Sequence, residues 1–374
     1  MTDKAPLVLS LDYPPNDGGI SRLTAGMVAA LTEMGSEPYV VTFGMAGKEG
    51  LLRPSASFTE VDRRKGVRDW QMLKAIRNYM KLMGRDAPVL ATVWNPEATL
   101  AMLAGARRIS VLAHGNEVMP YKRRGVKHWL RRTVLQRAHI VVCNSRFTES
   151  LVKGIAPKSK TAVLNPAVDA AAFSPSMTQD AARKILDLPP TARIALTVAR
   201  LDPIKGHETV LRAIATMPAS KRQEIVYVII GKGEMHAPLQ EAAESLGIAD
   251  QVRFAGFVAD QELTTWYAAA DLFVLPSIVD LGRRGMEGFG MALTEAQAAG
   301  LPVIGTRSGG IPDAVSEGEG GWLIEERDAS ALAQHLTYLV DAPAEFVKQG
   351  QRGAERVRHK QNWQDYASRL LELI

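Results

Sequence analysis

The chain has 374 residues, of which 46% are hydrophobic and 23% charged, with a net charge of +5 and a single cysteine. This length exceeds one ordinary hydrophobic core and predicts two domains. The composition is typical of a soluble globular protein and excludes a disordered or membrane-spanning chain, while one cysteine excludes an internal disulfide or a cysteine-based zinc cluster.

Positive and negative charges are unevenly divided along the chain. Residues 1–165 hold 25 Lys and Arg against 13 Asp and Glu, a net of +12. Residues 166–374 hold 20 against 27, a net of −7. Two halves of opposite charge predict two domains with different partners.

The first half of the chain alternates short apolar runs with helical patterns. Leu7–Leu11 predicts a strand, Tyr13–Gly19 a loop, and Ile20–Met34 a helix that stops at Gly35. Further strands are expected at residues 38–43, 89–93, 110–113 and 140–143. Alternation of this kind indicates a mostly parallel sheet that is covered by helices on both faces.

The same pattern restarts in the second half. Residues 173–190, which include Pro175, Pro189 and Pro190, are expected to form a loop-like or weakly helical linker. Strands are expected at residues 193–199, 225–230, 252–254, 272–275, 302–304 and 321–324, and helices at 206–216, 237–245, 261–269, 290–299 and 330–340. The predicted fold class is therefore α/β, with two Rossmann-like, doubly wound domains.

Ligands of doubly wound sheets bind at the loops that follow the carboxyl ends of the strands. Gly18 and Gly19 lie in such a loop, before a helix whose N-terminal amides can meet an anion, although a glycine pair is also ordinary in turns. The spacing is not Gly-x-Gly-x-x-Gly, so a nicotinamide cofactor is not supported. Arg200 and Lys205 follow a later strand, where they can clamp a diphosphate or lie as two solvated cations.

Two glutamates flank a glycine-rich turn in the second half. Glu287 precedes Gly288-Phe289-Gly290, and Glu295 lies about one turn into the helix that follows. Across this loop-to-helix junction the two carboxylates can line one pocket and accept hydrogen bonds from sugar and ribose hydroxyls. The alternative is a capping carboxylate and a surface glutamate.

These motifs together resemble glycosyltransferase family 4. The resemblance covers nearly the whole chain and rests on Glu287 and Glu295 at Glu-x7-Glu spacing, on the upstream Arg200 and Lys205, and on the segments 18–19, 114–117 and 308–313. It implies a GT-B fold, whose two domains face a cleft, and sugar transfer with retention of anomeric configuration. Residues 1–170, joined by a C-terminal helix at 354–374, would form the acceptor domain, and residues 171–353 the nucleotide-sugar donor domain.

The resemblance also implies a role for each site residue. Gly18 and Gly19 would contact the phosphates of the donor, and Arg200 and Lys205 would neutralise the departing diphosphate. Glu287 would lie beside the transferred sugar.

Further donor contacts follow from the same resemblance. Glu295 would bind the ribose, the amides of the turn Gly288-Phe289-Gly290 would hold the sugar hydroxyls, and the residues around Val258 would flank the base. His114 would lie near the sugar, as a general base, a hydrogen-bond donor or a packed polar residue. Front-face attack is implied by the resemblance, while the residues themselves leave double displacement open.

The donor is expected to be a nucleotide sugar, used without a cofactor. No Asp-x-Asp motif occurs in the chain, so the sequence does not require a metal ion. The segment Asp280–Gly290 looks most like the mannosyltransferases of this family that use GDP-mannose. Members that use UDP-sugars share both glutamates, so transfer of glucose, galactose or N-acetylglucosamine from a UDP-sugar is the alternative.

Two basic segments, residues 63–85 and 121–137, point to the acceptor. Each carries tryptophan and aliphatic residues at helical spacing between Lys and Arg, a pattern that fits docking on an anionic membrane or an ordinary helix packed into the core. Since the apolar run before Asp12 is too short for a signal peptide, we expect a cytoplasmic protein on the inner face of the membrane. The acceptor is then lipid-linked or a glycan, as in the synthesis of cell-envelope glycolipids and polysaccharides; nucleic acid is not expected because no nucleic-acid fold accompanies the charge.

Two other functions compete with this interpretation. A GT-B relative of the sucrose- or trehalose-synthase type would use a soluble acceptor. A non-catalytic nucleotide-sugar-binding partner in a glycan assembly complex would have no need to keep Arg200, Lys205, Glu287 and Glu295 together.

Overall fold

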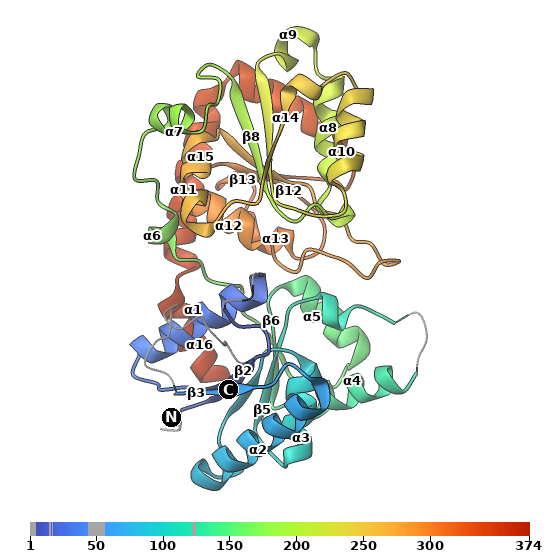
Figure 1. The fold of residues 1–374 in the computed structure, drawn as a ribbon, viewed down its shortest axis with the longest axis vertical. Coiled ribbons are helices and arrows are strands. Elements are labelled where there is room, and N and C mark those ends of the chain that lie inside the picture. Colours follow the sequence, from blue (N-terminus) through green and yellow to red (C-terminus); the bar gives the residue numbers. More distant parts are fainter. Residues whose placement is uncertain (1–4, 15, 17, 44–56, 122–124) are drawn as a thin grey trace. The chain divides into compact units, whose positions relative to one another are not determined.

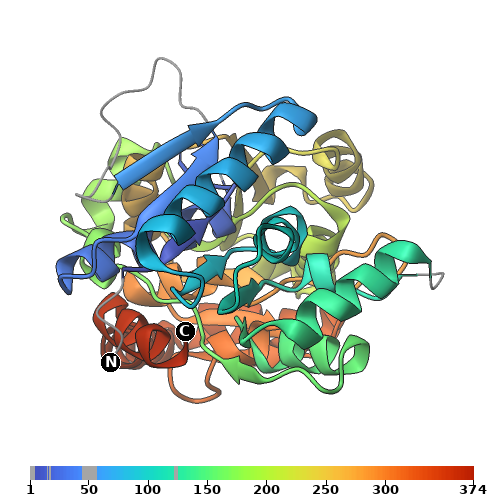
Figure 2. The ribbon, with the colours of Figure 1, turned by 90° about the horizontal axis from the view of Figure 1, so that it is seen from below.

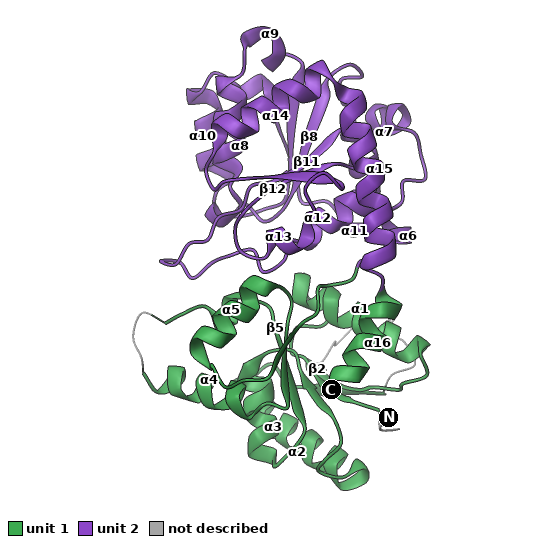
Figure 3. Ribbon diagram, turned by 180° about the vertical axis from the view of Figure 1, so that it is seen from behind, with its two compact units in different colours: residues 1–167, 363–374 green, residues 168–362 purple. Residues whose placement is uncertain are grey.

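A computed structural model describes residues 5–14, 16, 18–43, 57–121 and 125–374. The chain divides into two compact units (Figure 3). Unit 1 comprises residues 1–167 and 363–374, and unit 2 comprises residues 168–362. Each unit is an α/β layer structure with its own core.

Unit 1 is built on a seven-stranded sheet in the order β3-β2-β1-β4-β5-β6-β7, with every neighbouring pair parallel. Its strands are β1 (Leu7–Leu9), β2 (Tyr39–Phe43), β3 (Ser57–Val61), β4 (Val89–Ala91), β5 (Ile109–Ala113), β6 (Ile140–Cys143) and β7 (Thr161–Val163). The two strands that the sequence did not predict, β3 and β7, are the edges of this sheet. An edge strand is covered less completely than a central one, so its sequence lacks the continuous apolar run that identifies the others.

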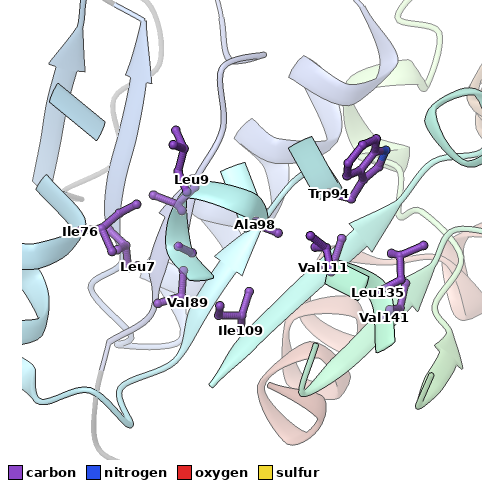
Figure 4. Close-up of a cluster of buried hydrophobic side chains, with 14 of the residues drawn as sticks. Leu7, Leu9, Ile76, Val89, Trp94, Ala98, Ile109, Val111, Leu135 and Val141 are labelled. Atoms are coloured by element: carbon purple, nitrogen blue, oxygen red, sulfur yellow. The ribbon is translucent and has the colours of Figure 1, made fainter. Parts of the chain in front are cut away.

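Helices cover the unit 1 sheet, as Figures 1 and 2 show. They are α1 (Gly19–Glu33), α2 (Lys65–Met83), η1 (Trp94–Ala98), α3 (Thr99–Ala104), η2 (Asn116–Val118), α4 (Val126–Arg137), α5 (Arg146–Ile155) and α16 (Trp363–Leu373). In the core, Leu7, Val89 and Ile109 from adjacent strands belong to one buried cluster with Ile76 of α2 (Figure 4). Their burial stabilises the arrangement by roughly 2 kcal/mol per large aliphatic side chain.

Unit 2 repeats this architecture with six parallel strands in the order β10-β9-β8-β11-β12-β13. The strands are β8 (Arg193–Val198), β9 (Ile225–Ile230), β10 (Val252–Gly256), β11 (Leu272–Leu275), β12 (Val303–Thr306) and β13 (Gly321–Ile324). The helices are α6 (Ala170–Phe173), α7 (Gln179–Ile185), η3 (Pro203–Lys205), α8 (His207–Thr216), α9 (Ala219–Arg222), α10 (His236–Ser245), η4 (Ala249–Gln251), α11 (Asp260–Ala269), α12 (Met291–Ala298), α13 (Ile311–Ala314), α14 (Ala329–Asp341) and α15 (Pro343–Lys360).

Successive residues of the unit 2 strands enter two different cores. Ile194 and Phe273 belong to one buried cluster, whereas their neighbours Ala195 and Val274 belong to another. Because side chains alternate between the faces of a strand, the two clusters lie on opposite faces of the sheet. The predicted coverage of both faces is therefore confirmed for this unit.

The C-terminal region differs from the sequence prediction. One helix was expected over residues 354–374, but the structure has two, α15 and α16, separated at Gln361 and Asn362. The backbone of Gln361 leaves the helical region (φ −133°), and its carbonyl accepts a hydrogen bond from the Val168 amide at 2.9 Å. The units divide after residues 167 and 362, whereas the sequence analysis placed these boundaries after residues 170 and 353.

Two further observations bear on the sequence predictions. The expected linker at 173–190 contains the helix α7, which begins after Thr178, whose hydroxyl accepts from the Ala181 amide. Within the described ranges, no helix is both long and apolar enough to span a bilayer.

Candidate functional site

In unit 2, the predicted donor residues gather at one edge of the sheet. Arg200 and Lys205 follow β8, Val258 follows β10, and Glu287 lies in the loop between β11 and α12. The remaining predicted residues, Gly288, Phe289, Gly290 and Glu295, run from that loop into α12. Because all strands of this sheet are parallel, their carboxyl ends, and the loops that follow them, lie at the same edge.

The closest contact between two of these side chains joins Lys205 to Glu287. The Lys205 ammonium lies 2.6 Å from Glu287 Oε2, and the side chains are 16% and 17% exposed. Lys205 is thus a largely buried, paired cation rather than a solvated one. Arg200 is exposed, and no hydrogen bond or ion pair of its side chain is found within the described residues, so its guanidinium is available for an anion.

The loops at this edge approach each other so closely that glycine is required. At Gly309 (φ 54°) an added Cβ would lie 2.5 Å from the Glu287 carbonyl oxygen, and the next amide, of Gly310, donates to that oxygen at 2.9 Å. At Gly206 (φ 74°) an added Cβ would lie 1.9 Å from the Pro276 carbonyl oxygen. The main chain beside Lys205 and Glu287 is therefore held by contacts that a side chain would displace.

The start of α12 presents main-chain amides to the same edge. Gly290 precedes the helix with φ 101°, and the Phe289 ring is buried in the core of unit 2. With that ring turned inward, Phe289 can offer a ligand only its backbone. The first amides of a helix readily donate hydrogen bonds to anions and hydroxyl oxygens. Glu295, further along α12, is 3% exposed, and its Oε2 lies 3.4 Å from the Tyr267 hydroxyl, so it is not a surface glutamate.

A buried histidine, His207, was not singled out by the motif analysis. Its Nδ1 lies 3.0 Å from the Tyr227 hydroxyl and its Nε2 lies 3.4 Å from the Arg200 carbonyl oxygen. Burial lowers the pKa of His207 to about 4, so the ring is neutral at physiological pH. The spacing of His207, Val210, Leu211 and Ile214 is that of one buried helix face, which could have identified it.

In unit 1, His114 follows β5 and has a fixed ring. Nε2 lies 2.8 Å from the Thr92 carbonyl oxygen, and since a carbonyl only accepts, Nε2 carries the proton. The His114 amide donates to Glu117 Oε1 at 2.6 Å, and the Asn144 side chain donates to the His114 carbonyl at 3.1 Å. In the neutral ring, Nδ1 is therefore the nitrogen that can accept a proton.

Gly18 and Gly19 lie where β1 leads into α1. Gly18 precedes the helix with φ 155°, a value that favours glycine, and nothing lies within 4 Å of a Cβ added there. Gly19 is the first residue of the helix. A helix therefore starts at this glycine pair, as the sequence predicts, and a Cβ at Gly18 would meet open space.

Two carboxyl groups near this edge of unit 1 were missed by the sequence analysis. Glu97 of η1 is 2% exposed; its Oε1 accepts from the Leu11 amide at 3.3 Å, while Oε2 has no partner in the described part of the chain. Burial raises the pKa of Glu97 to about 7. Burial also raises the pKa of Asp12, against the lowering effect of the nearby His114. No spacing pattern marks these residues, since η1 has no helical repeat.

The basic segments of unit 1 expose aromatic and aliphatic side chains. In α4, Val126 and Trp129 are 87% and 73% exposed, whereas Val134 and Leu135 are buried in the core. In α2, Trp70 and Leu82 are exposed while Ile76 and Met80 are buried. The apolar stripes are thus divided between core and solvent. Lys122, Arg123 and Arg124, which were part of the predicted basic segment, lie outside the described residues.

Two family models match consecutive parts of the chain. Residues 17–172 match the model described as "Glycosyltransferase Family 4", and residues 178–357 match "Glycosyl transferases group 1". The chain belongs to glycosyltransferase family 4. A curated relative, the GDP-mannose-dependent alpha-(1-6)-phosphatidylinositol monomannoside mannosyltransferase of Mycolicibacterium smegmatis, is 28% identical over 98% of this chain and 97% of its own length.

Solved structures share the fold of this glycosyltransferase. Sucrose-phosphate synthase from Thermosynechococcus elongatus superimposes with a TM-score of 0.81 at 22% identity, covering 99% of this chain and 98% of the other. Anabaena Alr3699/HepE, in complex with UDP and glucose, has a TM-score of 0.82 at 17% identity over 99% and 98% of the two chains. The predicted α/β fold of the GT-B class is confirmed.

Proposed function

We propose that this glycosyltransferase moves mannose from GDP-mannose, with retention of configuration, to a lipid-linked or glycan acceptor in cell-envelope glycolipid or polysaccharide synthesis. The observation that carries this proposal is the largely buried Lys205–Glu287 pair, 2.6 Å apart, with the exposed Arg200 at the same sheet edge. Two cations, one carboxylate and a helix start suit a ligand that joins a diphosphate to a hydroxylated sugar.

The proposed chemistry follows from where charge develops. Breaking the bond between sugar and diphosphate leaves negative charge on the phosphate and an oxocarbenium-like sugar. Arg200 and Lys205 stabilise the phosphate charge. Lys205 does so from a position fixed by Glu287, which is preorganised electrostatic catalysis. Glu287 lies beside the sugar, the amides at Phe289 and Gly290 hold its hydroxyls, and Glu295 binds the ribose.

The remaining roles involve the base and unit 1. Val258 flanks the base, and Gly18 and Gly19 contact the donor phosphates. His114 offers Nδ1 to the acceptor or to the sugar. No metal or cofactor is needed in this scheme, so transfer should continue in the presence of EDTA.

Two candidate donors have support from the comparisons. GDP-mannose is supported by the curated relative, whose name states that donor, and by the segment Asp280–Gly290. A UDP-sugar is the second candidate, favoured by the fold neighbour that binds UDP and glucose. Thermal-shift measurements with GDP, UDP, GDP-mannose and UDP-sugars separate the two, because only a ligand of the folded state raises the melting temperature with its concentration.

Stabilisation by GDP and GDP-mannose alone is the expected outcome. Selective stabilisation by UDP-sugars would replace mannose with the second candidate, and no response to any nucleotide would refute the donor site. Slow hydrolysis of the bound donor distinguishes an enzyme from a non-catalytic binding partner. The anomeric configuration of the product, read by NMR, tests retention.

The acceptor side of the proposal rests on unit 1. Exposed Trp129 and Trp70, on helices that carry Lys and Arg, are suited to the boundary of an anionic lipid layer. We therefore place the enzyme peripherally on the cytoplasmic face of the membrane. Vesicle flotation tests this placement: binding should require anionic lipid and weaken with salt, and an absence of binding would favour a soluble acceptor.

A further inference from the structure

The loop that carries Glu287 is long and must be held in place. It runs from the end of β11 at Leu275 to the start of α12 at Met291. Its outer part is closed on itself, because the Asp280 and Gly285 amides each donate to the carbonyl of the other, at 2.9 and 3.0 Å. A loop of this length requires tethers to the body of the domain to keep one conformation.

One of those tethers is a carboxylate from a different part of the sheet. Glu326 follows β13, and its Oε1 accepts a hydrogen bond from the Val279 amide at 2.9 Å and another from the Ser308 hydroxyl. Val279 lies at the base of the Glu287 loop, whereas Ser308 follows β12. A single half-buried carboxylate thus connects the loops of two neighbouring strands.

The second of these loops also contacts Glu287 directly. Gly309 and Gly310 come immediately after Ser308, and the Gly310 amide donates to the Glu287 carbonyl oxygen at 2.9 Å. Glu326 therefore fixes both the beginning of the Glu287 loop, at Val279, and the segment against which Glu287 rests.

We propose that Glu326 is a positioning residue that sets the place of Glu287 relative to the donor sugar. That Glu326 holds the loop in place does not depend on the proposed function, whereas its effect on catalysis rests on that function. Losing the carboxylate leaves the Val279 amide and the Ser308 hydroxyl without their acceptor, so the loop moves away from its present place. Small displacements of this kind can lower the turnover rate about 100-fold without abolishing substrate binding.

The test compares Glu326→Ala with Glu326→Gln, whose amide oxygen can still accept both hydrogen bonds. Glu325→Ala is the matched control, because Glu325 is the adjacent carboxylate and instead pairs with Arg307 at the surface, 3.3 Å away. Hydrogen exchange of residues 277–287, followed by mass spectrometry, reports the tether, and kcat and KM for the donor report its consequence. We expect Glu326→Ala to speed exchange in this segment and to lower kcat about tenfold or more, with KM changed much less. The Glu326→Gln and Glu325→Ala variants should behave like the wild type.

Unchanged exchange in Glu326→Ala would overturn the tether. Faster exchange with unchanged kcat would overturn the positioning role. Should the wild type turn over no nucleotide sugar, the proposed function fails, while the exchange comparison still decides the tether. If Glu326→Ala does not fold, Ser308→Ala removes one of the two hydrogen bonds, and the same two measurements apply with smaller expected changes.

Discussion

Within each unit, the loops at the carboxyl edge of the sheet are held in place, and the kind of contact that holds them differs between the units. In unit 2 the loops touch through their main chains, as at Gly309 against Glu287 and Gly206 against Pro276, in addition to the side-chain clamp at Glu326. In unit 1 side chains reach the main chain, as when His114 bonds the Thr92 carbonyl and Glu97 accepts from the Leu11 amide.

Under the proposed function, this difference fits a division of labour between the units. Main-chain contacts at glycine leave little freedom for a loop to adjust, which suits a site shaped for one ligand class. Side-chain contacts can change with single substitutions while the sheet stays the same. Under the proposed function, we therefore expect substitutions at the unit 2 edge to affect donor use most strongly. Substitutions at the unit 1 edge, apart from those at Gly18 and Gly19, should affect the acceptor.

Removing a cation from the unit 2 edge should have the largest effect. In Lys205→Met the largely buried ammonium beside Glu287 is lost, and with it the charge that we propose stabilises the departing diphosphate. We expect kcat to fall about 100- to 1000-fold, the range seen when one preorganised donor is removed from an active site. The control is Lys221→Met, which breaks a partly exposed ion pair with Asp341 and should leave turnover unchanged. Equal activities would argue against the proposed role of Lys205.

Adding one methyl group to the unit 2 edge should have the next largest effect. Gly309→Ala brings a Cβ to 2.5 Å from the Glu287 carbonyl, whereas Gly247→Ala, at a similar φ of 65°, meets nothing within 4 Å. Both variants lose about 1 kcal/mol of stability from left-handed strain. Only Gly309→Ala should also lose turnover, about tenfold, because the displaced segment bears on Glu287. Equal losses of activity would show that the contact with Glu287 is unimportant.

Two buried groups, one in each unit, should change stability in opposite directions as the pH falls. Glu97 has a pKa of about 7 in the folded state against an ordinary 4.5, so the folded state holds the extra proton, and its contribution to stability grows as the pH falls from 7 to 5. His207 has a pKa of about 4 against an ordinary 6.5, so the unfolded state holds the extra proton, and its contribution shrinks over the same range.

Chemical denaturation of the wild type, Glu97→Gln and His207→Gln at pH 7 and pH 5 measures these contributions. The free energy of unfolding of the wild type minus that of Glu97→Gln should be larger at pH 5 than at pH 7. The free energy of unfolding of the wild type minus that of His207→Gln should be smaller at pH 5 than at pH 7. Changes of the same sign in both comparisons would contradict the assigned burial effects.

Removing an exposed aromatic ring from unit 1 should have the smallest effect on the fold. Trp129 is 73% exposed, so Trp129→Ala should leave the melting temperature unchanged. Its partitioning onto anionic vesicles should fall about tenfold, because a large apolar side chain no longer enters the lipid. Tyr338→Ala in unit 2 removes another exposed aromatic and should not alter partitioning. If both variants bind vesicles equally well, α4 is not the docking surface.

The sequence by itself determined the class of the fold and most of its elements. Continuous apolar runs such as 272–275 identify buried parallel strands, and Gly35 and Gly300 mark helix ends, because these signals are local. The Glu287–Glu295 spacing and the upstream Arg200 and Lys205 led to the family that the matching models establish.

The tertiary structure decided which of these side chains meet. Lys205 and Glu287 are 82 positions apart in the chain and form an ion pair only because β8 and β11 are neighbours in the sheet. The clamp at Glu326 and the buried carboxyl Glu97 likewise depend on partners from distant segments. A contact of this kind leaves no periodic trace in the sequence, since its energy depends on the positions of residues that only the folded chain brings together.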